Sequence, residues 1–241
     1  MFSEAATFFF NPVLIAAAVL PAAALLIYVY KKDRLEPEPK SLLLRLLVMG
    51  VLATSAAAFV ERIGLNLLAQ VFDEYSLPCI IIFNMLIVAP AEELAKYLLL
   101  RWRTWNSPHF NCSFDGVVYA VFVSLGFALW ENIDYVTSYG LSVAAIRAVT
   151  AVPGHCAFAI FMGAWYGQAK RREAAGDAAG CRRCLRTGVR TAILLHGLSD
   201  VFASLATPEG AWIFFAFILV MFVIAFRLLR AKARADDYLG M

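Results

Sequence analysis

The chain has 241 residues, of which 62% are hydrophobic and 16% are charged, and its formal net charge is +3. Soluble domains are about 45–50% apolar and about 25% charged, so this composition excludes an ordinary soluble protein. The mean hydropathy of +0.72 predicts a polytopic all-α membrane protein that is almost wholly embedded. No room remains for a sizeable soluble domain, and we expect one membrane-embedded domain over residues 1–241.

Apolar runs long enough to cross a bilayer recur along the chain and predict about seven transmembrane helices. The first run is followed by Lys31 and Lys32 and is not preceded by basic residues. A cleaved signal peptide has the opposite charge order, so we expect this run to be retained as a span. The predicted spans cover residues 8–30, 42–60, 77–100, 117–136, 141–167, a sixth span that ends near residue 206, and 212–229.

Three polar stretches separate or extend these spans. Residues 31–40 form a loop that Pro37 and Pro39 stiffen. Residues 61–70 either lie in the membrane interface or lengthen the second helix. Residues 170–190 are interpreted as a basic loop that leads into the sixth span. Cys181 and Cys184 in this loop form a lone CxxC without the second pair that a zinc ribbon needs, and we assign it no chemistry.

The distribution of basic residues predicts the orientation. Of the 21 Lys and Arg residues, 19 fall in loops, span ends or the tail that seven spans place on one side, and only Arg62 and Arg147 fall on the other. Basic residues favour the cytoplasmic side. We therefore expect the N-terminus outside and the C-terminus in the cytoplasm.

The third span contains the sequence Ala-Pro-Ala-Glu-Glu-Leu-Ala-Lys at residues 89–96. A charged side chain at bilayer depth costs about 2.5–3.5 kcal/mol on insertion scales, and such residues usually mark functional sites. On a helix, Glu92 and Glu93 lie four and three residues before Lys96, so both carboxylates can reach it. Pro90 lacks an N–H and frees a carbonyl one turn earlier, which predicts a kink just before the pair.

Three later spans also carry ionisable groups. Glu131 lies in the fourth span with Phe127 one turn before it, which predicts an aromatic wall beside the carboxylate. His155 lies in the fifth span, and the sixth holds His196 and Asp200 on one helix face. The alternatives are structural: helix pairing through Lys96 or the His196–Asp200 pair, a Glu131 that reaches water, and a packing role for His155.

Three motifs on successive spans resemble the PrsW family of intramembrane proteases: Glu92-Glu93-x-x-Lys96, Phe127-x-x-x-Glu131 and His196-x-x-x-Asp200. The Glu-Pro-Glu-Pro sequence at 36–39 is also similar to that family. The resemblance covers roughly residues 33–202. A more distant similarity is to the Abi/CAAX prenyl endopeptidase group, which has histidine where this chain has Glu131.

The resemblance implies an intramembrane endopeptidase that cuts a single-span membrane protein such as an anti-sigma factor. Hydrolysis needs a base for an enclosed water and a positive group for the oxyanion. Glu92 or Glu93 can be the base, and His196, oriented by Asp200, can face the oxyanion or bind a metal. The predicted catalytic residues are Glu92, Glu93, Lys96, Glu131, His196 and Asp200.

The charge balance of this site favours a metal. Four carboxylates face one lysine, and unpaired buried charges are costly, so either some acids are protonated or a divalent cation lies among them. Catalytic zinc takes three N or O ligands and a water. We expect zinc or another divalent metal on His155, His196 and Glu131, with Glu93 as base. The rival is a metal-free site in which a glutamate and His196 activate water.

Two non-enzymatic interpretations remain open: a transporter with a polar pathway and a catalytically silent membrane scaffold. The sequence contains no visible inverted repeat, which disfavours the transporter. As partners we expect the lipid bilayer and a single-span membrane protein, and no nucleic acid. The expected location is the plasma (inner) membrane.

Overall fold

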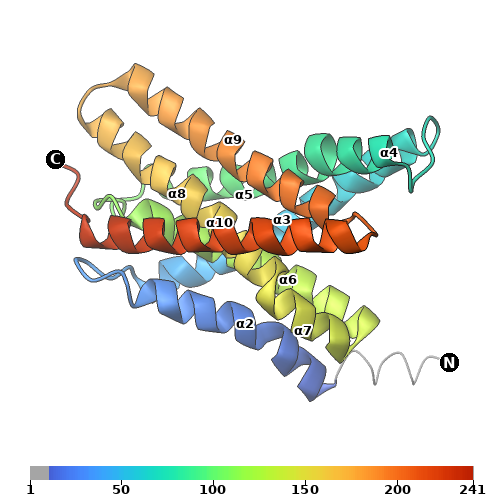
Figure 1. Ribbon diagram of the computed structural model, residues 1–241. Helices are drawn as coiled ribbons and strands as arrows, with labels where there is room; N and C mark the ends of the chain where they lie inside the picture. Colours follow the sequence, from blue (N-terminus) through green and yellow to red (C-terminus); the bar gives the residue numbers. More distant parts are fainter. Residues whose placement is uncertain (1–10, 241) are drawn as a thin grey trace.

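The computed structural model describes residues 11–240, and within that range its regular elements are all helical (Figure 1). The predicted all-α membrane fold is thereby confirmed. One unusual element is a π-helical stretch between two α-helices. The elements in chain order are α2 (Pro12–Tyr30), α3 (Lys40–Leu68), α4 (Leu77–Ile82), the π-helix η1 (Phe83–Val88), α5 (Ala89–Thr104), α6 (Asp115–Tyr139), α7 (Leu141–Val149), α8 (Ala151–Ala174), α9 (Ala178–Ala203) and α10 (Pro208–Arg234).

Six helical segments of the described chain are long and apolar enough to cross a membrane. They correspond to the predicted spans other than the sixth, although residues 8–10 of the first lie outside the described range. The sixth corresponds to α9, which has 26 residues but carries four arginines in its first half. These arginines lower its apolar character without shortening it. Long arginine stems can extend toward water from such a helix.

The predicted basic loop at 170–190 is wrong. α8 continues to Ala174 and α9 begins at Ala178, so only a tight turn separates them. Gly176 adopts φ +75°, a conformation that favours glycine, and the Asp177 carboxylate accepts a hydrogen bond from the Gly180 N–H at 2.7 Å. The charge of this stretch suggests a loop, but Gly176 and the N-cap residue Asp177 mark the short turn between the two helices.

The fifth predicted span is interrupted. α7 ends at Val149 and α8 begins at Ala151, with Thr150 between them in a non-helical conformation. Pro153 in the first turn of α8 has no N–H to donate to the preceding turn, so a break there loses little hydrogen bonding. The polar stretch from 61 lengthens α3 to Leu68. Before Pro90 the chain forms the π-helical stretch η1, and the predicted kink stays a prediction.

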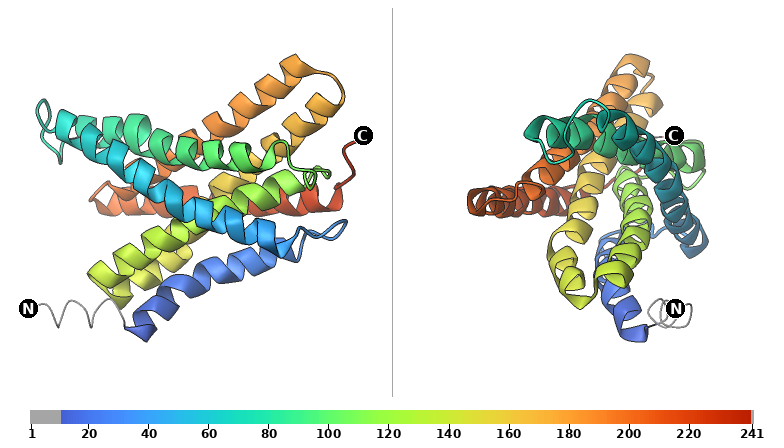
Figure 2. Two further views of the ribbon diagram at one scale, coloured as in Figure 1. Left: turned by 180° about the vertical axis from the view of Figure 1, so that it is seen from behind. Right: turned by 90° about the vertical axis from the view of Figure 1, so that its right-hand side faces the viewer.

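α6 lies at the centre of the bundle and packs against α2, α3, α5, α7 and α8 (Figure 2). Glycines permit its closest crossing. A Cβ at Gly126 would overlap the Leu47 carbonyl of α3, and a Cβ at Gly50 would overlap the Val123 carbonyl of α6. Small residues at membrane helix interfaces let backbones approach in this way.

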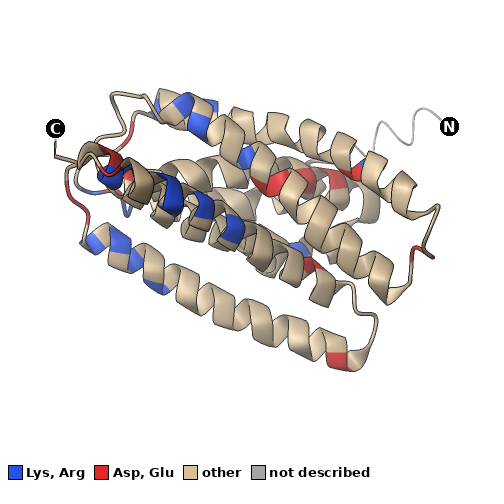
Figure 3. Ribbon diagram, turned by 90° about the horizontal axis from the view of Figure 1, so that it is seen from above, with Lys and Arg blue, Asp and Glu red and all other residues tan. Residues whose placement is uncertain are grey.

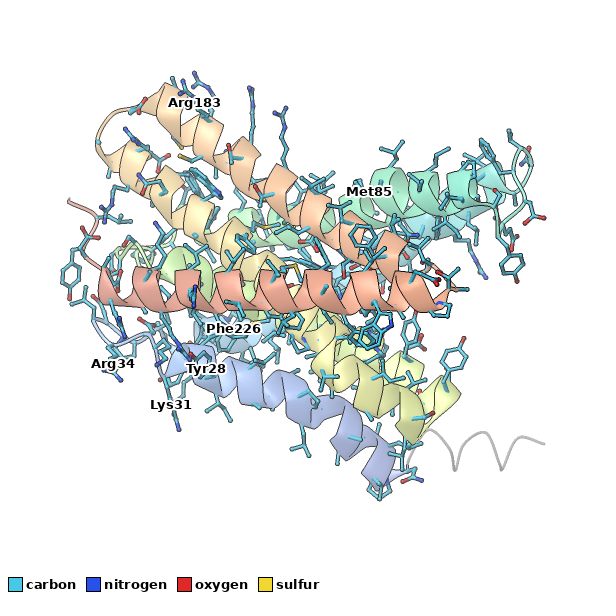
Figure 4. The ribbon with its side chains drawn as sticks, in the orientation of Figure 1. Tyr28, Lys31, Arg34, Met85, Arg183 and Phe226 are labelled. Carbon is cyan, nitrogen blue, oxygen red and sulfur yellow. The ribbon has the colours of Figure 1, made fainter. Side chains whose placement is uncertain are left out.

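Basic residues gather toward the end of the bundle that carries the C-terminus (Figure 3). We call this the basic end; it holds residues 31–39, 105–114 and 235–240. Lys31 and Arg34 project from the first of these segments and Arg183 from the start of α9 (Figure 4). Near the same end, the rings of Tyr28 and Phe226 lie edge to face at 6.0 Å and join α2 to α10. The orientation of the bundle in a membrane stays a prediction.

Candidate active site

The predicted site residues come from four helices and lie together inside the bundle. Glu92, Glu93 and Lys96 belong to α5, Glu131 to α6, His155 to α8, and His196 and Asp200 to α9. The Lys96 ammonium lies 2.9 Å from Glu92 and 2.8 Å from Glu93, and all three side chains are buried. Helical spacing alone explains these two ion pairs.

Phe127 packs against Lys96 and His155, and its expected contact with Glu131 stays a prediction. Its ring lies under the Lys96 ammonium, 3.9 Å from ring centre to nitrogen, and 5.7 Å from the His155 ring. A cation over an aromatic face is stabilised by the ring quadrupole, most strongly where water is excluded. The FxxxE spacing therefore serves two partners: Phe127 supports Lys96, and Glu131 reaches His155.

His155 connects α5 to α6. Its Nδ1 lies 3.2 Å from the Lys96 ammonium and its Nε2 lies 3.0 Å from Glu131. An ammonium can only donate a hydrogen bond, so Nδ1 accepts and the Nε2–H donates to Glu131. This tautomer directs the Nδ1 lone pair toward the Lys96 ammonium of α5.

His196 has a carboxylate near each of its ring nitrogens. Its Nδ1 lies 2.9 Å from Glu93, and its Nε2 lies 3.2 Å from Asp200 and 3.9 Å from Glu92. Phe158 stacks on its ring at 4.7 Å between centres. The predicted contact between His196 and Asp200 is present, one helical turn apart on α9.

Four of these residues form a group that can hold a metal ion. Glu92, Glu93, His155 and His196 each offer a ligand atom, and the four atoms lie within 4.8 Å of one another. Glu131, a predicted ligand, is outside this group because it faces the other nitrogen of His155. Metal-binding histidines usually donate their second ring N–H to a carboxylate, and Glu131 and Asp200 lie where such partners belong.

A large cavity adjoins the group. Its volume is about 540 Å³, and Glu92, Glu131, His155, His196 and Asp200 all line it. Among the described residues that line it Glu93 does not appear; its side chain is 1% exposed. The two adjacent glutamates therefore differ, because Glu92 faces space that a substrate could enter and Glu93 faces the protein interior.

Two residues that sequence reasoning left out of the site also lie at this cavity. Arg147 on α7 makes an ion pair with Glu131 at 2.9 Å and donates to the side-chain oxygen of Asn132. Glu61 on α3 has a buried Oε1 that no hydrogen-bond donor within residues 11–240 reaches. The sequence does set Arg147 apart, because it is one of only two basic residues on the predicted outer side of the membrane.

A helical membrane bundle with carboxylates, histidines and a lysine around an internal cavity has the architecture of an intramembrane hydrolase. Residues 38–229 match the family described as "PrsW family intramembrane metalloprotease". This match covers most of the chain, and the chain belongs to that family. The resemblance inferred from the three motifs is confirmed.

Several curated relatives are similar over much of their length, and each is named "Protease PrsW". The relative from Geobacillus kaustophilus is 35% identical over 65% of this chain and 67% of its own. The relative from Oceanobacillus iheyensis is 31% identical over 91% and 96%, and that from Bacillus subtilis is 30% identical over 91% and 94%. No solved structure matches. The protein is therefore an intramembrane protease and a multi-pass protein of the cell membrane.

Proposed function

We propose that the protein cuts a single-span membrane protein, such as an anti-sigma factor, with a water that Glu92 activates. The cavity of about 540 Å³ carries this proposal, because it brings Glu92 and both histidines to one accessible wall. The cavity also reaches Leu205 in the α9–α10 turn and Ala211 at the start of α10, at the end opposite to the basic end (Figure 1). If the charge distribution sets the orientation as predicted, the cut falls toward the outer side of the membrane.

The difference between the two glutamates supports Glu92 as the base. Glu92 makes one ion pair with Lys96 and lines the cavity, so its carboxylate can take a proton from a water there. Glu93 is engaged through one oxygen by both Lys96 and His196. Its role in this proposal is to bind and to balance charge, and Glu92 later returns the proton to the leaving amine.

The residues fit a divalent metal. The donor residues already surround one positive charge, because the Lys96 ammonium contacts three of the four: Glu92, Glu93 and His155. Two imidazoles with carboxylates are the donor set that catalytic zinc accepts. We propose His155, His196 and Glu93 as the ligands of zinc, with Glu93 in place of Glu131.

When bound, the metal would polarise the scissile carbonyl and lower the pKa of water. The chain supplies the remaining functions. Glu131 and Asp200 fix the ring orientation of His155 and His196 through their outward-facing nitrogens. The buried Lys96 balances the excess negative charge of the two glutamates, Phe127 supports its ammonium, and Phe158 packs on the His196 ring.

The experiment uses purified protein in liposomes with a synthetic single-span peptide. We expect cleavage at one bond, located by mass spectrometry, and its loss in Glu92→Gln. Cys181→Ser, on α9 outside this site, is the matched control and should cut normally. Normal cleavage by Glu92→Gln would refute its role as base. Uptake of solutes without any cleavage would instead support the transporter interpretation.

A further inference from the structure

A second pocket, separate from the active-site cavity, lies at the basic end between the end of α2, the loop after it and the end of α10 (Figure 4). Its volume is about 430 Å³. We call it the basic pocket, and its lining residues are Tyr28, Lys32, Arg34, Arg230, Ala233 and Arg234. Four of these side chains are cations, and no carboxylate lines the pocket among the described residues. The pocket is therefore suited to an anion.

Neighbouring acids do not neutralise the four cations of the basic pocket. None of the ion pairs found within residues 11–240 includes one of them. Asp33 is buried and accepts the Glu38 N–H at 3.1 Å. Asp236 accepts the Phe114 N–H at 2.8 Å, and Asp237 makes an ion pair with α8. Because like charges gathered together repel, an anion in the pocket would stabilise this end of the bundle.

Tyr28 orients two of the cations. Its hydroxyl accepts a hydrogen bond from the Arg230 Nε at 3.2 Å, and the Lys32 ammonium lies over its ring at 5.2 Å from the centre. Phe226 packs against the same ring from α10. The hydroxyl occupies only the Nε of Arg230, so both terminal nitrogens remain for a ligand. Two parallel N–H groups of a guanidinium match two oxygens of a phosphate.

An exposed apolar stripe leads from the basic pocket along α10 toward the middle of the predicted membrane span. Val223 and Leu219 share a helix face with Arg230, because they precede it by seven and eleven residues. Both apolar side chains are exposed, and so is Ile27 beside Tyr28 on α2. A phosphate at Arg230 that carried acyl chains could lay them along this stripe. The combination of cations and apolar surface indicates a lipid rather than a free phosphate ion.

We propose that the basic pocket binds the phosphate headgroup of an anionic phospholipid and that this lipid ties the end of α2 to the end of α10. Basic pockets between membrane helices are suited to such headgroups. An anionic lipid fits better than a zwitterionic one, because the ammonium of a zwitterionic headgroup would enter among four cations. The site is independent of the proposed metal, since none of its residues belongs to the intramembrane group.

The test measures thermal unfolding of the full chain in a neutral detergent with added phosphatidylglycerol, phosphatidylcholine or inorganic phosphate. A ligand that binds only the folded state stabilises it. We expect phosphatidylglycerol to raise the unfolding midpoint by a few degrees more than the other two additives. The double variant Arg34→Gln/Arg230→Gln should lose this difference. The matched control Arg182→Gln/Arg183→Gln removes two exposed arginines at the start of α9, outside the pocket, and should keep it.

Lys32→Gln/Arg234→Gln provides a second pocket variant in case the first does not fold, and it should lose the same difference. Three results would overturn the proposal. Equal midpoints in the two lipids would show that the headgroup charge is not recognised. The same response in the pocket variants as in the control would place the lipid on general surface charge. An equal shift with inorganic phosphate alone would make the ligand a free phosphate ion.

Discussion

The guanidinium of Arg147 lies 2.9 Å from the same Glu131 oxygen that faces the Nε2 of His155. Arg147 also donates to Asn132, whose amide donates to the Ala18 carbonyl on α2. A chain of polar contacts therefore runs from α2 through Arg147 to His155. In this arrangement Arg147 positions the carboxylate that orients a proposed ligand.

We expect Arg147→Met to lower kcat by about 10–100-fold, the usual cost of losing a group that orients a metal ligand. Arg147→Lys should recover part of the activity, because it keeps the charge but not the planar fork. The readouts are kcat and the metal content of the purified variants. Unchanged kcat and metal content in Arg147→Met would contradict the positioning role.

The adjacent glutamates should respond differently to amide substitution. Glu92→Gln should reduce cleavage by at least about 10²-fold while metal content and unfolding midpoint stay close to those of the parent. Glu93→Gln should also abolish cleavage, and it should lower metal content and stability because Lys96 and His196 both lose a buried partner. Cleavage, elemental analysis and thermal unfolding on the two variants test this. The reverse pattern would exchange their proposed roles.

Contacts within one helix could be predicted from the sequence, because helical geometry fixes which residues share a face. The Glu92–Lys96, Glu93–Lys96 and His196–Asp200 contacts are of this kind, and all are present. The apolar runs of the sequence predicted the all-α class, and they also placed these residues within long apolar helices.

Contacts between helices could not be predicted, because they depend on stagger and rotation. His155 joins α5 to α6 in this way, because its two nitrogens contact Lys96 and Glu131. Phe127 turned toward Lys96 for the same reason.

The α3–α6 crossing should not tolerate a larger residue. Gly126→Ala would place a methyl group against the Leu47 carbonyl, and backbone cannot move aside as a flexible side chain can. We expect a loss of about 1–3 kcal/mol, typical of overpacking, seen as a lower unfolding midpoint. Gly240→Ala, where a Cβ meets open space, is the matched control. Equal midpoints for the two variants would refute the tight crossing.

The distribution of basic residues predicts the topology. A reporter fused after Met241 should be active in the cytoplasm, and one inserted near Glu209 should be active outside, because 19 of 21 basic residues fall on the predicted inner side. Paired cytoplasmic and external reporters at both positions make the measurement internally controlled. Inverted activities would turn the cavity toward the cytoplasm and reverse the predicted side of cleavage.

The metal can be tested by content and by removal. Elemental analysis of active protein should find about one equivalent of zinc, and a strong chelator should abolish cleavage until zinc is restored. His155→Ala and His196→Ala should each lose the metal, because each removes a nitrogen donor from a group of four. Cys181→Ser, on α9 outside this group, should retain it. Full cleavage with well under one equivalent of metal, unaffected by chelators, would leave Glu92 and His196 to activate water without a metal.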